Sequence, residues 1–329
     1  MTISQWELDL HERRLPRSVS RDGDHRNPYQ RDKARVLHSA AFRRLQAKTQ
    51  VLGVGLSDFY RTRLTHSLEA AQIGTGITAQ LWNKFPDIAK ALALDPTLIE
   101  TICLAHDIGH PPFGHGGEIA LNYMMHEHGG FEGNGQTFRI VTQLEPYTAD
   151  HGMNLCRRSI LGLVKYPNFI NTLHTKEAAG IRPQSLRQVK ADDWHPPKGL
   201  FQCDKPLFDW LLAPLNNDEK QLFMQFTDST SAHSKTCFKS FDCSIMELAD
   251  DIAYGIHDLE DAIVMDMVQK THFIEDVTTP LKGLSIPWLS DNIESLTTKL
   301  FSHAHHERKN AIGALVNSFI TAIEIQRVD

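Results

Sequence analysis

The sequence lacks the features of a membrane-spanning or secreted chain. Its 329 residues contain no uninterrupted apolar run of the roughly 18 residues that a transmembrane helix needs. The first residues, MTISQWELDLHERRLPRS, hold neither the apolar core nor the small-residue cleavage site of a signal peptide. Low-complexity tracts and internal repeats are absent as well, so we expect a globular, cytoplasmic protein without membrane contact.

Cysteine is sparse and occurs in a pattern that excludes two classes of protein. The five cysteines are an odd number and include no CxxC pair, which argues against a disulfide framework and against a structural zinc knuckle. Alternating β-branched segments of convincing length are also missing, so the sequence predicts a mainly α-helical protein. Histidine, by contrast, occurs 18 times. Because histidine is the commonest metal ligand, a metal site is the first hypothesis to pursue.

Charge is unevenly distributed along the chain. The net charge is -6, yet residues 1–63 carry 13 Lys or Arg against 7 Asp or Glu. Such a basic segment indicates an anionic ligand nearby, either phosphate or nucleic acid. A solvated arm without a ligand explains the same arginines equally well, so both interpretations stay open.

Apolar residues recur at helical spacing along most of the chain. The pattern predicts helices at 31–49, 64–81, 96–105, 118–128, 244–267 and 311–325. We expect residues 1–30 to form a basic N-terminal arm and residues 31–329 to form a single catalytic unit. Prolines interrupt the region from about 142 to 240, which we interpret as an irregular insertion within that unit.

Three segments supply side chains that suit a divalent metal ion. They are a helix with His66, the His106-Asp107 pair at a helix end, and the acidic segment ELADDIAYGIHDLED at 247–261. Two imidazoles and two carboxylates suit Mn²⁺, Fe²⁺, Co²⁺, Ni²⁺ or Zn²⁺, with Mg²⁺ less favoured by the imidazoles. Periodicity does not decide between Asp250 and Asp251 as a ligand, because the two lie on opposite flanks of the polar face.

A His-Asp dipeptide is weak evidence by itself, since a second one, His257-Asp258, occurs in the acidic helix. His106-Asp107 lies beside the Gly/Pro-rich break HDIGHPPFGHGG, where neighbouring side chains can converge on one ion. His257 and Asp258 instead point about 100° apart within one helix. A satisfied hydrogen bond at a helix end is the alternative for the first pair, and a packed or surface position is the alternative for His66.

The same break offers a candidate catalytic pair. His115 and Glu118 are three residues apart at a predicted helix N-terminus, so the carboxylate can orient the imidazole as a general base or acid requires. The alternative is an exposed His115 beside a Glu118 that only complements the helix dipole. Further along the chain, Asp250, Tyr254 and Asp258 form one stripe at i, i+4 and i+8, which either lines a pocket or faces water.

At these residues the sequence resembles the HD-domain deoxynucleoside triphosphate triphosphohydrolases, and among them the bacterial dGTPase-like proteins. Five motifs carry the resemblance over most of the chain, in the family's order: RDKARVLHSAAFRRLQAKTQV (31–51), RTRLTHSLEAAQIG (61–74), AHDIGHPPFGHGGE (105–118), LVKYP (163–167) and LADDIAYGIHDLEDA (248–262). Five linked motifs are far more specific than one His-Asp pair. The resemblance implies the helical metallohydrolase fold of HD domains.

The resemblance also implies a role for each matching position. The four metal ligands would be His66, His106, Asp107 and Asp250, which decides for Asp250 over Asp251. The catalytic pair would be His115 and Glu118. The substrate contacts would be Tyr254, Asp258 and Gln50 at the deoxyribose, and Arg63, Lys165, Tyr166 and either Arg43 or Arg44 at the triphosphate, with His110 as a further candidate in the Gly/Pro-rich break.

The implied reaction is hydrolysis of deoxynucleoside triphosphates, dGTP among them, to a deoxynucleoside and inorganic triphosphate. The implied ion is Mn²⁺ or Mg²⁺, with Fe, Co, Ni or Zn as alternatives. The resemblance further implies a homo-oligomer, either a hexamer or a tetramer, and single-stranded DNA or a regulatory dNTP as additional partners. Members of the family commonly exceed 329 residues, so we expect the chain to lack a C-terminal part of the family's proteins.

Two other functions stay open at the level of sequence. An HD-domain phosphohydrolase acting on a nucleoside monophosphate, a cyclic dinucleotide or an alarmone would share the metal site but release different products. A non-catalytic regulatory protein would bind a nucleotide or nucleic acid through the basic N-terminal segment and keep the metal site only for structure. Product identity tests the first alternative, and strongly salt-dependent DNA binding without turnover would indicate the second.

Overall fold

The fold is given by a computed structural model, which describes residues 9–16, 23–49, 61–174, 189–229, 233–284 and 286–326. Helices dominate these residues, and the strands among them are one short antiparallel pair, which confirms the prediction of a mainly α fold. Within the same ranges, no helix combines the length and the apolar character that a membrane span requires.

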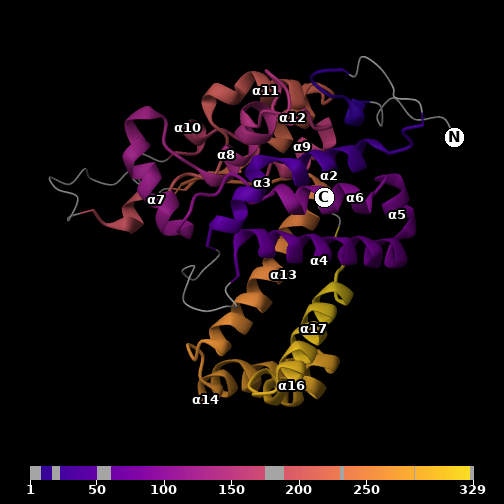
Figure 1. Ribbon diagram of the computed structural model, residues 1–329, viewed down its shortest axis with the longest axis vertical. Helices are drawn as coiled ribbons and strands as arrows, with labels where there is room; N and C mark the ends of the chain where they lie inside the picture. Colours follow the sequence, from indigo (N-terminus) through magenta and orange to yellow (C-terminus); the bar gives the residue numbers. More distant parts are fainter. Residues whose placement is uncertain are drawn as a thin grey trace.

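The elements follow one another along the chain as shown in Figure 1. The α-helices are α2 (Pro28–His38), α3 (Ala40–Arg44), α4 (Arg63–Lys84), α5 (Pro86–Ala91), α6 (Pro96–Ala105), α7 (Gly114–Met125), α8 (Gly133–Arg139), α9 (Arg157–Leu163), α10 (Ile170–Leu173), α11 (Lys205–Leu211), α12 (Asn217–Phe223), α13 (Phe241–Val264), α14 (Lys270–Phe273), α15 (Thr279–Lys282), α16 (Pro287–Leu300) and α17 (His305–Thr321). Shorter helical turns are 3-10 turns at Leu45–Ala47, His126–His128, Ala191–Trp194 and Gln202–Asp204, and π turns at Ile140–Leu144 and Ile274–Thr278. The strands β1 (Phe226–Thr227) and β2 (Lys235–Thr236) pair antiparallel.

The single helix predicted at 31–49 is wrong, because the chain breaks it at Ser39. Ser39 is extended, with ψ 149°, and ends α2. Its hydroxyl then accepts a hydrogen bond from the Phe42 backbone N–H at 3.0 Å and so caps α3. Apolar periodicity continues across this residue, which is why periodicity alone predicted one helix.

Several other helix boundaries differ from the predictions. α7 begins at Gly114, before the predicted start at 118, because Phe113 in the left-handed region turns the chain into the helix. α17 begins at His305 and ends at Thr321, so it lies earlier than the predicted 311–325. α13 begins at Phe241, where the Ser240 hydroxyl accepts a hydrogen bond from the Cys243 N–H at 3.1 Å. Side-chain caps and backbone turns therefore set these ends, not the apolar stripe.

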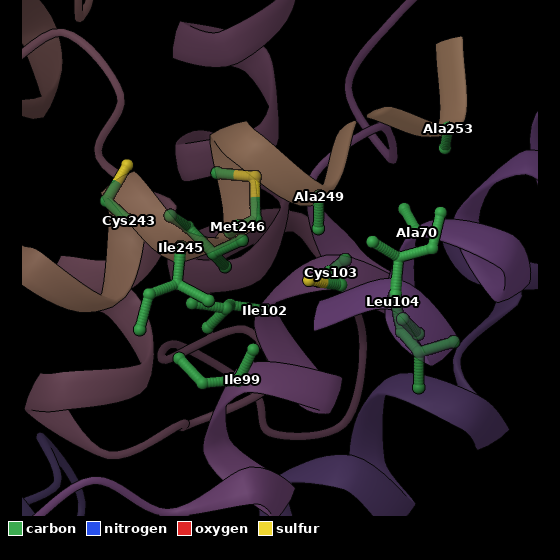
Figure 2. Close-up of a cluster of buried hydrophobic side chains, with 14 of the residues drawn as sticks. Ala70, Ile99, Ile102, Cys103, Leu104, Cys243, Ile245, Met246, Ala249 and Ala253 are labelled. Atoms are coloured by element: carbon green, nitrogen blue, oxygen red, sulfur yellow. The ribbon is translucent and has the colours of Figure 1, made fainter. Parts of the chain in front are cut away.

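Three helices, α4, α6 and α13, form the centre of the core. α6 begins with Asp95 as its cap and Pro96 in its first turn, and seven of its ten residues are buried. Figure 2 shows the side chains of Ile99, Ile102 and Cys103 from α6 against Ile245 and Ala249 from α13. Burial of each large aliphatic side chain contributes about 1.5–3 kcal/mol, so this contact fixes the positions of both helices.

α13 links the core to the C-terminal helices. In Figure 1 it crosses α4 and continues to α14, with α17 alongside its second half. The first half packs on α6 and α9, and the second half packs on α17. Residues near the middle of α13 therefore lie where the helix passes α4.

Two regions predicted to be irregular contribute to the body of the protein. α9, within the 142–240 region, packs on α6 and α13. Its Arg158 donates to Asp242 on α13 at 2.7 Å, and both residues are buried. From the N-terminal 30 residues, Arg13 forms an ion pair of 2.5 Å with the buried Asp32. These contacts join both regions to the helices that carry the core.

α4 and α6 approach each other closely at Gly74. A Cβ at this position would lie 2.8 Å from Cys103 Sγ and 3.0 Å from Ile99 Cγ2. Because both neighbours are fully buried, Gly74→Ala must push the two helices apart, and we expect it to lower the free energy of unfolding by about 1–3 kcal/mol. Urea denaturation followed by circular dichroism measures this change.

Gly313→Ala is the matched control for this packing prediction. Gly313 also lies in a helix, but nothing is within 4 Å of a Cβ built there. Alanine should therefore stabilise α17 by about 0.5–1 kcal/mol through its higher helix propensity. If both substitutions changed the stability by the same amount, the close approach at Gly74 would not be the cause.

Candidate functional site

A cavity of about 830 Å³ lies where α4, α7 and α13 meet the turns that follow α6 and α9. It brings together most of the side chains singled out from the sequence. Those that line it are Arg63, His106, Asp107, His110, His115, Lys165, Tyr166, Asp250 and Tyr254. The segments that supply them are up to about 190 residues apart in the sequence, so the fold is what assembles this set.

A cluster of imidazoles and carboxylates lies at the cavity wall, where His106, Asp107 and Asp250 line the cavity and His66 is not a lining residue. The ligand atoms of His66, His106 and Asp107 lie within 4.8 Å of one another, and all three residues are buried. Asp250 Oδ1 on α13 lies 2.9 Å from His66 Nε2 on α4 and 3.4 Å from His106 Nε2. The geometry therefore places Asp250, and not Asp251, against the histidines.

The turn after α6 is held in place by α8. The Thr137 hydroxyl donates to the His106 carbonyl and accepts from the Gly109 N–H, both at 3.0 Å. A Cβ at Gly109 would lie 2.1 Å from the Thr137 backbone nitrogen, so only glycine permits this approach. The glycine of the HDIGH sequence thus allows α8 to fix the direction in which His106 and Asp107 point.

The tautomer of His106 follows from its hydrogen bond. Its Nδ1 lies 2.6 Å from the Cys103 carbonyl oxygen, which can only accept, so Nδ1 carries a proton and donates it. Nε2 then faces the cluster. Among the described residues, this buried nitrogen has no hydrogen-bond partner. A buried nitrogen without a partner, next to two carboxylates, fits a divalent metal ion held by imidazole and carboxylate ligands.

Charges within the cluster shift the ionisation of its members. Burial disfavours the imidazolium, yet the carboxylates of Asp107 and Asp250 raise the pKa of His106 to about 9. Burial opposes the charge of Asp250, but His106 and His66 hold the pKa of this carboxyl well below its usual range. The cluster without a metal thus keeps its carboxylates ionised and carries positive charge on an imidazole, in the position that a cation would take.

A second cluster lies at the start of α7. The Glu118 carboxylate is buried and accepts from the Gly133 N–H at 2.8 Å and from Lys198 Nζ at 2.9 Å. His115 Nδ1 lies 3.6 Å from Glu118 Oε2, and the His115 side chain is 76% exposed. Burial raises the pKa of Glu118, but His115 and Lys198 outweigh this and hold it well below its usual value. An anionic carboxylate therefore lies behind an accessible imidazole.

Three basic side chains line the same cavity, and each contacts a carboxylate of one of the two clusters. Arg63 Nη1 donates to Asp107 Oδ2 at 2.6 Å. Lys165 Nζ lies 3.3 Å from Asp250 Oδ2, and Lys198 binds Glu118. The cavity therefore presents three cationic donors that could meet an anion, each of them held by a carboxylate.

Lys48 binds the backbone of the histidine-rich segment that follows α6. Its ammonium donates to the carbonyls of Ile108 at 3.0 Å and His110 at 2.6 Å. Burial, together with the nearby positive charge of Arg63, lowers the pKa of Lys48 to about 8. His110 itself is buried, with its Nδ1 3.2 Å from Asp107 Oδ1, and burial lowers its pKa to about 4. His110 is therefore a neutral neighbour of the His/Asp cluster.

Some of the residues singled out from the sequence lie elsewhere. Gln50 falls outside the described residues. Arg43 and Arg44 do not line the cavity, and Arg43 donates to the His38 carbonyl on the exposed side of α3. Asp258 lies one turn beyond Tyr254 and is also not a lining residue.

Lys198 lines the cavity together with Asn134, although no motif of the sequence indicates it. Lys198 lies in the segment WHPPKGL, where no motif was recognised. Its contact with Glu118 joins residues 80 positions apart, and neither composition nor periodicity carries that information. The only signal is a lysine in an irregular, proline-rich stretch, which is too common to indicate a site.

Comparison with known proteins gives consistent matches. The HD domain family matches residues 63–166, a range that contains both clusters except for Asp250 and Lys198. The chain is 59% identical over 327 residues to a deoxyguanosinetriphosphate triphosphohydrolase-like protein of Shewanella woodyi, which covers 99% of this chain and 72% of that protein. It is 58% identical over 330 residues to a protein of the same name from Vibrio vulnificus, with 99% of this chain and 73% of the relative covered.

Proposed function

The chain belongs to the family of deoxyguanosinetriphosphate triphosphohydrolase-like proteins, and on this basis we propose that it hydrolyses deoxynucleoside triphosphates, dGTP among them, to a deoxynucleoside and inorganic triphosphate. One observation carries the proposal. A cluster that could hold a metal ion, an imidazole backed by an anionic carboxylate, and three basic side chains all meet at a single cavity. Hydrolysis of a polyphosphate ester needs these three components together.

His66, His106, Asp107 and Asp250 are the residues that would hold the metal, with Mn²⁺ or Mg²⁺ as the ion of the proposal. When bound, such an ion supplies charge neutralisation and polarisation of a phosphate oxygen. The surrounding residues orient these ligands. The Cys103 carbonyl fixes the His106 ring, and Arg63 holds the Asp107 carboxylate, as neighbours of metal ligands commonly do.

His115 is the proposed general base or acid, with Glu118 as its orienting partner. An ionised Glu118 stabilises the imidazolium that forms when His115 takes a proton from an attacking water. Lys198 and the Gly133 N–H fix the carboxylate in turn. The exposed imidazole can then move toward the substrate without disturbing the buried carboxylate.

Substrate binding is the proposed role of the remaining lining residues. Arg63, Lys165, Tyr166 and Lys198 would meet the triphosphate, whose three to four negative charges favour several donors at once. Tyr254, half-exposed at the cavity on α13, would pack on the deoxyribose, with Asp258 near the 3′-hydroxyl. A tyrosine ring against the 2′ side of the sugar would disfavour ribonucleotides, since their extra hydroxyl needs space and a hydrogen-bond partner.

The experiment that tests this proposal identifies the products. The purified protein is incubated with each of the four dNTPs and with GTP, in Mn²⁺ or Mg²⁺, and the products are separated by anion exchange. We expect deoxynucleoside and inorganic triphosphate from dNTPs, with little or no turnover of GTP. Release of orthophosphate or pyrophosphate would contradict the proposal and indicate a different HD-domain phosphohydrolase.

Isotope labelling sharpens this test. Water that attacks the α-phosphorus forms a new P–O bond and breaks the bond to the 5′-oxygen, which leaves on the nucleoside with a proton. In ¹⁸O-labelled water, the label should therefore appear in the triphosphate and not in the deoxynucleoside. Label in the deoxynucleoside would mean attack at carbon and would exclude the proposed chemistry.

A further inference from the structure

A partly buried arginine just before the start of α4 has no role in the proposed chemistry. Arg61 does not line the cavity, and its side chain is only 10% exposed. It precedes the helix that carries His66, and it contacts the helix that carries Asp250, Tyr254 and Asp258. We propose that Arg61 is a positioning residue that fixes the second half of α13 against α4 and thereby places Tyr254 and Asp258 for recognition of the sugar.

The guanidinium of Arg61 uses its donors on both helices. On α4, Nε lies 2.8 Å from the Glu69 carboxylate. On α13, Nη1 donates to the His257 backbone carbonyl at 2.9 Å and lies 2.6 Å from Asp261 Oδ2. A planar fork with fixed directions holds such partners in one geometry, which a lysine ammonium does not.

Neighbouring charges extend this contact into a network. His257 Nδ1 lies 3.0 Å from the Glu69 carboxylate, so Glu69 meets both Arg61 and α13. Glu260, whose carboxylate is 3.5 Å from Arg61 Nη2, also binds Lys309 of α17 at 2.9 Å. Three helices, α4, α13 and α17, are therefore tied together around one guanidinium.

The network of ion pairs around Arg61 lies close to Tyr254 and Asp258 along α13, so it can affect where these two residues lie. α13 contacts α4, or the residues just before it, at three successive levels. Ala249 packs near Gly74, Asp250 meets His66, and His257 with Asp261 meets Arg61. Tyr254 lies between the second level and the third, and Asp258 lies within the third, between His257 and Asp261. Tyr254 is 50% exposed, so packing of its own side chain does little to place it, and the direction of the helix backbone has to do so.

The position of α13 near the core is fixed independently of Arg61. The buried side chains of Ile245, Met246 and Ala249 anchor its first half, and the metal ligand Asp250 lies next to this anchor. Loss of the Arg61 contacts should therefore change the sugar contacts more than the metal site. This difference separates a positioning role from a general structural one.

The test compares Arg61→Gln with Arg158→Gln. Arg158 is the matched control because its side chain is also largely shielded, at 6% exposed against 10% for Arg61. It also binds an acid of α13, Asp242, and two backbone carbonyls, those of Leu92 and Ala93. It holds the opposite end of α13, far along the helix from Tyr254. Both variants should lose thermal stability, while only Arg61→Gln should affect the sugar contacts.

Three measurements are made on each purified variant: hydrogen exchange along α13, Mn²⁺ affinity by calorimetry, and kcat/KM for dGTP and GTP. For Arg61→Gln we expect faster exchange confined to residues 254–264, Mn²⁺ affinity within about threefold of the parent, and a fall of about 10²-fold in kcat/KM for dGTP, since misplacement of a contact by about 1 Å costs that much. The preference for dGTP over GTP should fall with it. Arg61→Lys should restore only part of this loss.

The inference rests on the proposed function, but its failure can be distinguished from failure of that function. Unchanged exchange of residues 254–264 in Arg61→Gln would overturn it whether or not the protein turns over dNTPs. Equal loss of Mn²⁺ affinity and turnover with the dGTP preference intact would show that Arg61 is only structural. If Arg61→Gln does not fold, Asp261→Asn removes one contact of the same network. The same three measurements on that variant then decide.

Discussion

Replacing Asp107 with alanine is expected to abolish divalent-metal binding and dNTP turnover together. The Asp107 carboxylate lies within 4.8 Å of the ligand atoms of His66 and His106 and is one of two carboxylates in the cluster. Its pKa is held below the usual range, against burial, by Arg63 and the histidines, so it is ionised and ready to bind a cation. Calorimetric titration with Mn²⁺ and the dGTP product assay measure the two losses.

The ion pair between Asp107 and Arg63 makes a second variant necessary. Arg63 Nη1 lies 2.6 Å from Asp107 Oδ2, and both side chains are buried. Alanine leaves the Arg63 charge without a partner, which costs about 3–5 kcal/mol in comparable buried pairs. Asp107→Asn keeps the shape and one acceptor for Arg63 but removes the negative charge. We expect this variant to fold and still to bind no metal, as circular dichroism and calorimetry would show.

Asp251 provides the matched control for this prediction. It is also an aspartate that lines the same cavity, but it is exposed, and it is Asp250 that contacts His66 and His106. Asp251→Ala should therefore leave Mn²⁺ affinity nearly unchanged. Retention of Mn²⁺ binding by Asp107→Asn, or an equal loss in Asp251→Ala, would show that the ion binds elsewhere in the protein.

The residues of the His/Asp cluster could be predicted from the sequence because they occur in short motifs that are recognisable locally. The His106-Asp107 pair and the glycine two residues later form such a pattern, and the structure shows that Gly109 is needed for contact with α8. Periodicity failed to choose between Asp250 and Asp251, because that choice depends on where α4 lies. The 2.9 Å contact between Asp250 and His66 shows which of the two faces the histidines, and the ligand role that the resemblance implies for Asp250 stays a prediction.

Other features depend on contacts that no local pattern encodes. Lys198 reaches Glu118 from a proline-rich stretch 80 residues away, and Arg61 reaches His257 across 196 residues. The helix break at Ser39 was missed for a different reason. One hydroxyl that caps α3 there outweighs an uninterrupted apolar pattern. Sequence thus predicts the helices and the motif residues, while the ion pairs that orient them require the structure.

Each cationic side chain of the cavity is paired with a carboxylate, which would affect how an anionic substrate binds. Arg63, Lys165 and Lys198 each contact a carboxylate of the His/Asp cluster or that of Glu118. Burial opposes the charge of Lys165, but the nearby Asp250 raises its pKa above the usual value. A triphosphate must compete with these carboxylates for the same donors. We therefore expect the carboxylates to keep the cationic side chains in place before the substrate arrives, which lowers the entropic cost of binding.

His115→Ala should lose rate while the metal site and the fold stay intact. General acid–base catalysis by a positioned imidazole contributes about 10²–10⁴-fold, and we expect kcat for dGTP to fall by that factor. Mn²⁺ affinity should not change, because His115 lies outside the cluster of possible ligand atoms. The side chain is 76% exposed, so its removal should change stability by no more than about 0.5 kcal/mol. Calorimetry, thermal melting and single-turnover kinetics measure the three quantities.

The comparison with Glu118→Gln shows whether the two residues act as a unit. Glutamine keeps an acceptor for the Gly133 N–H but removes the charge that stabilises an imidazolium. If the carboxylate works only through His115, the double variant should be no slower than His115→Ala, because a unit that has lost its base gains nothing from its orienting partner. His128→Ala, an exposed histidine that does not line the cavity, controls for loss of an imidazole. Additive losses in the double variant would assign Glu118 a separate role, with Lys198 as its partner at the substrate.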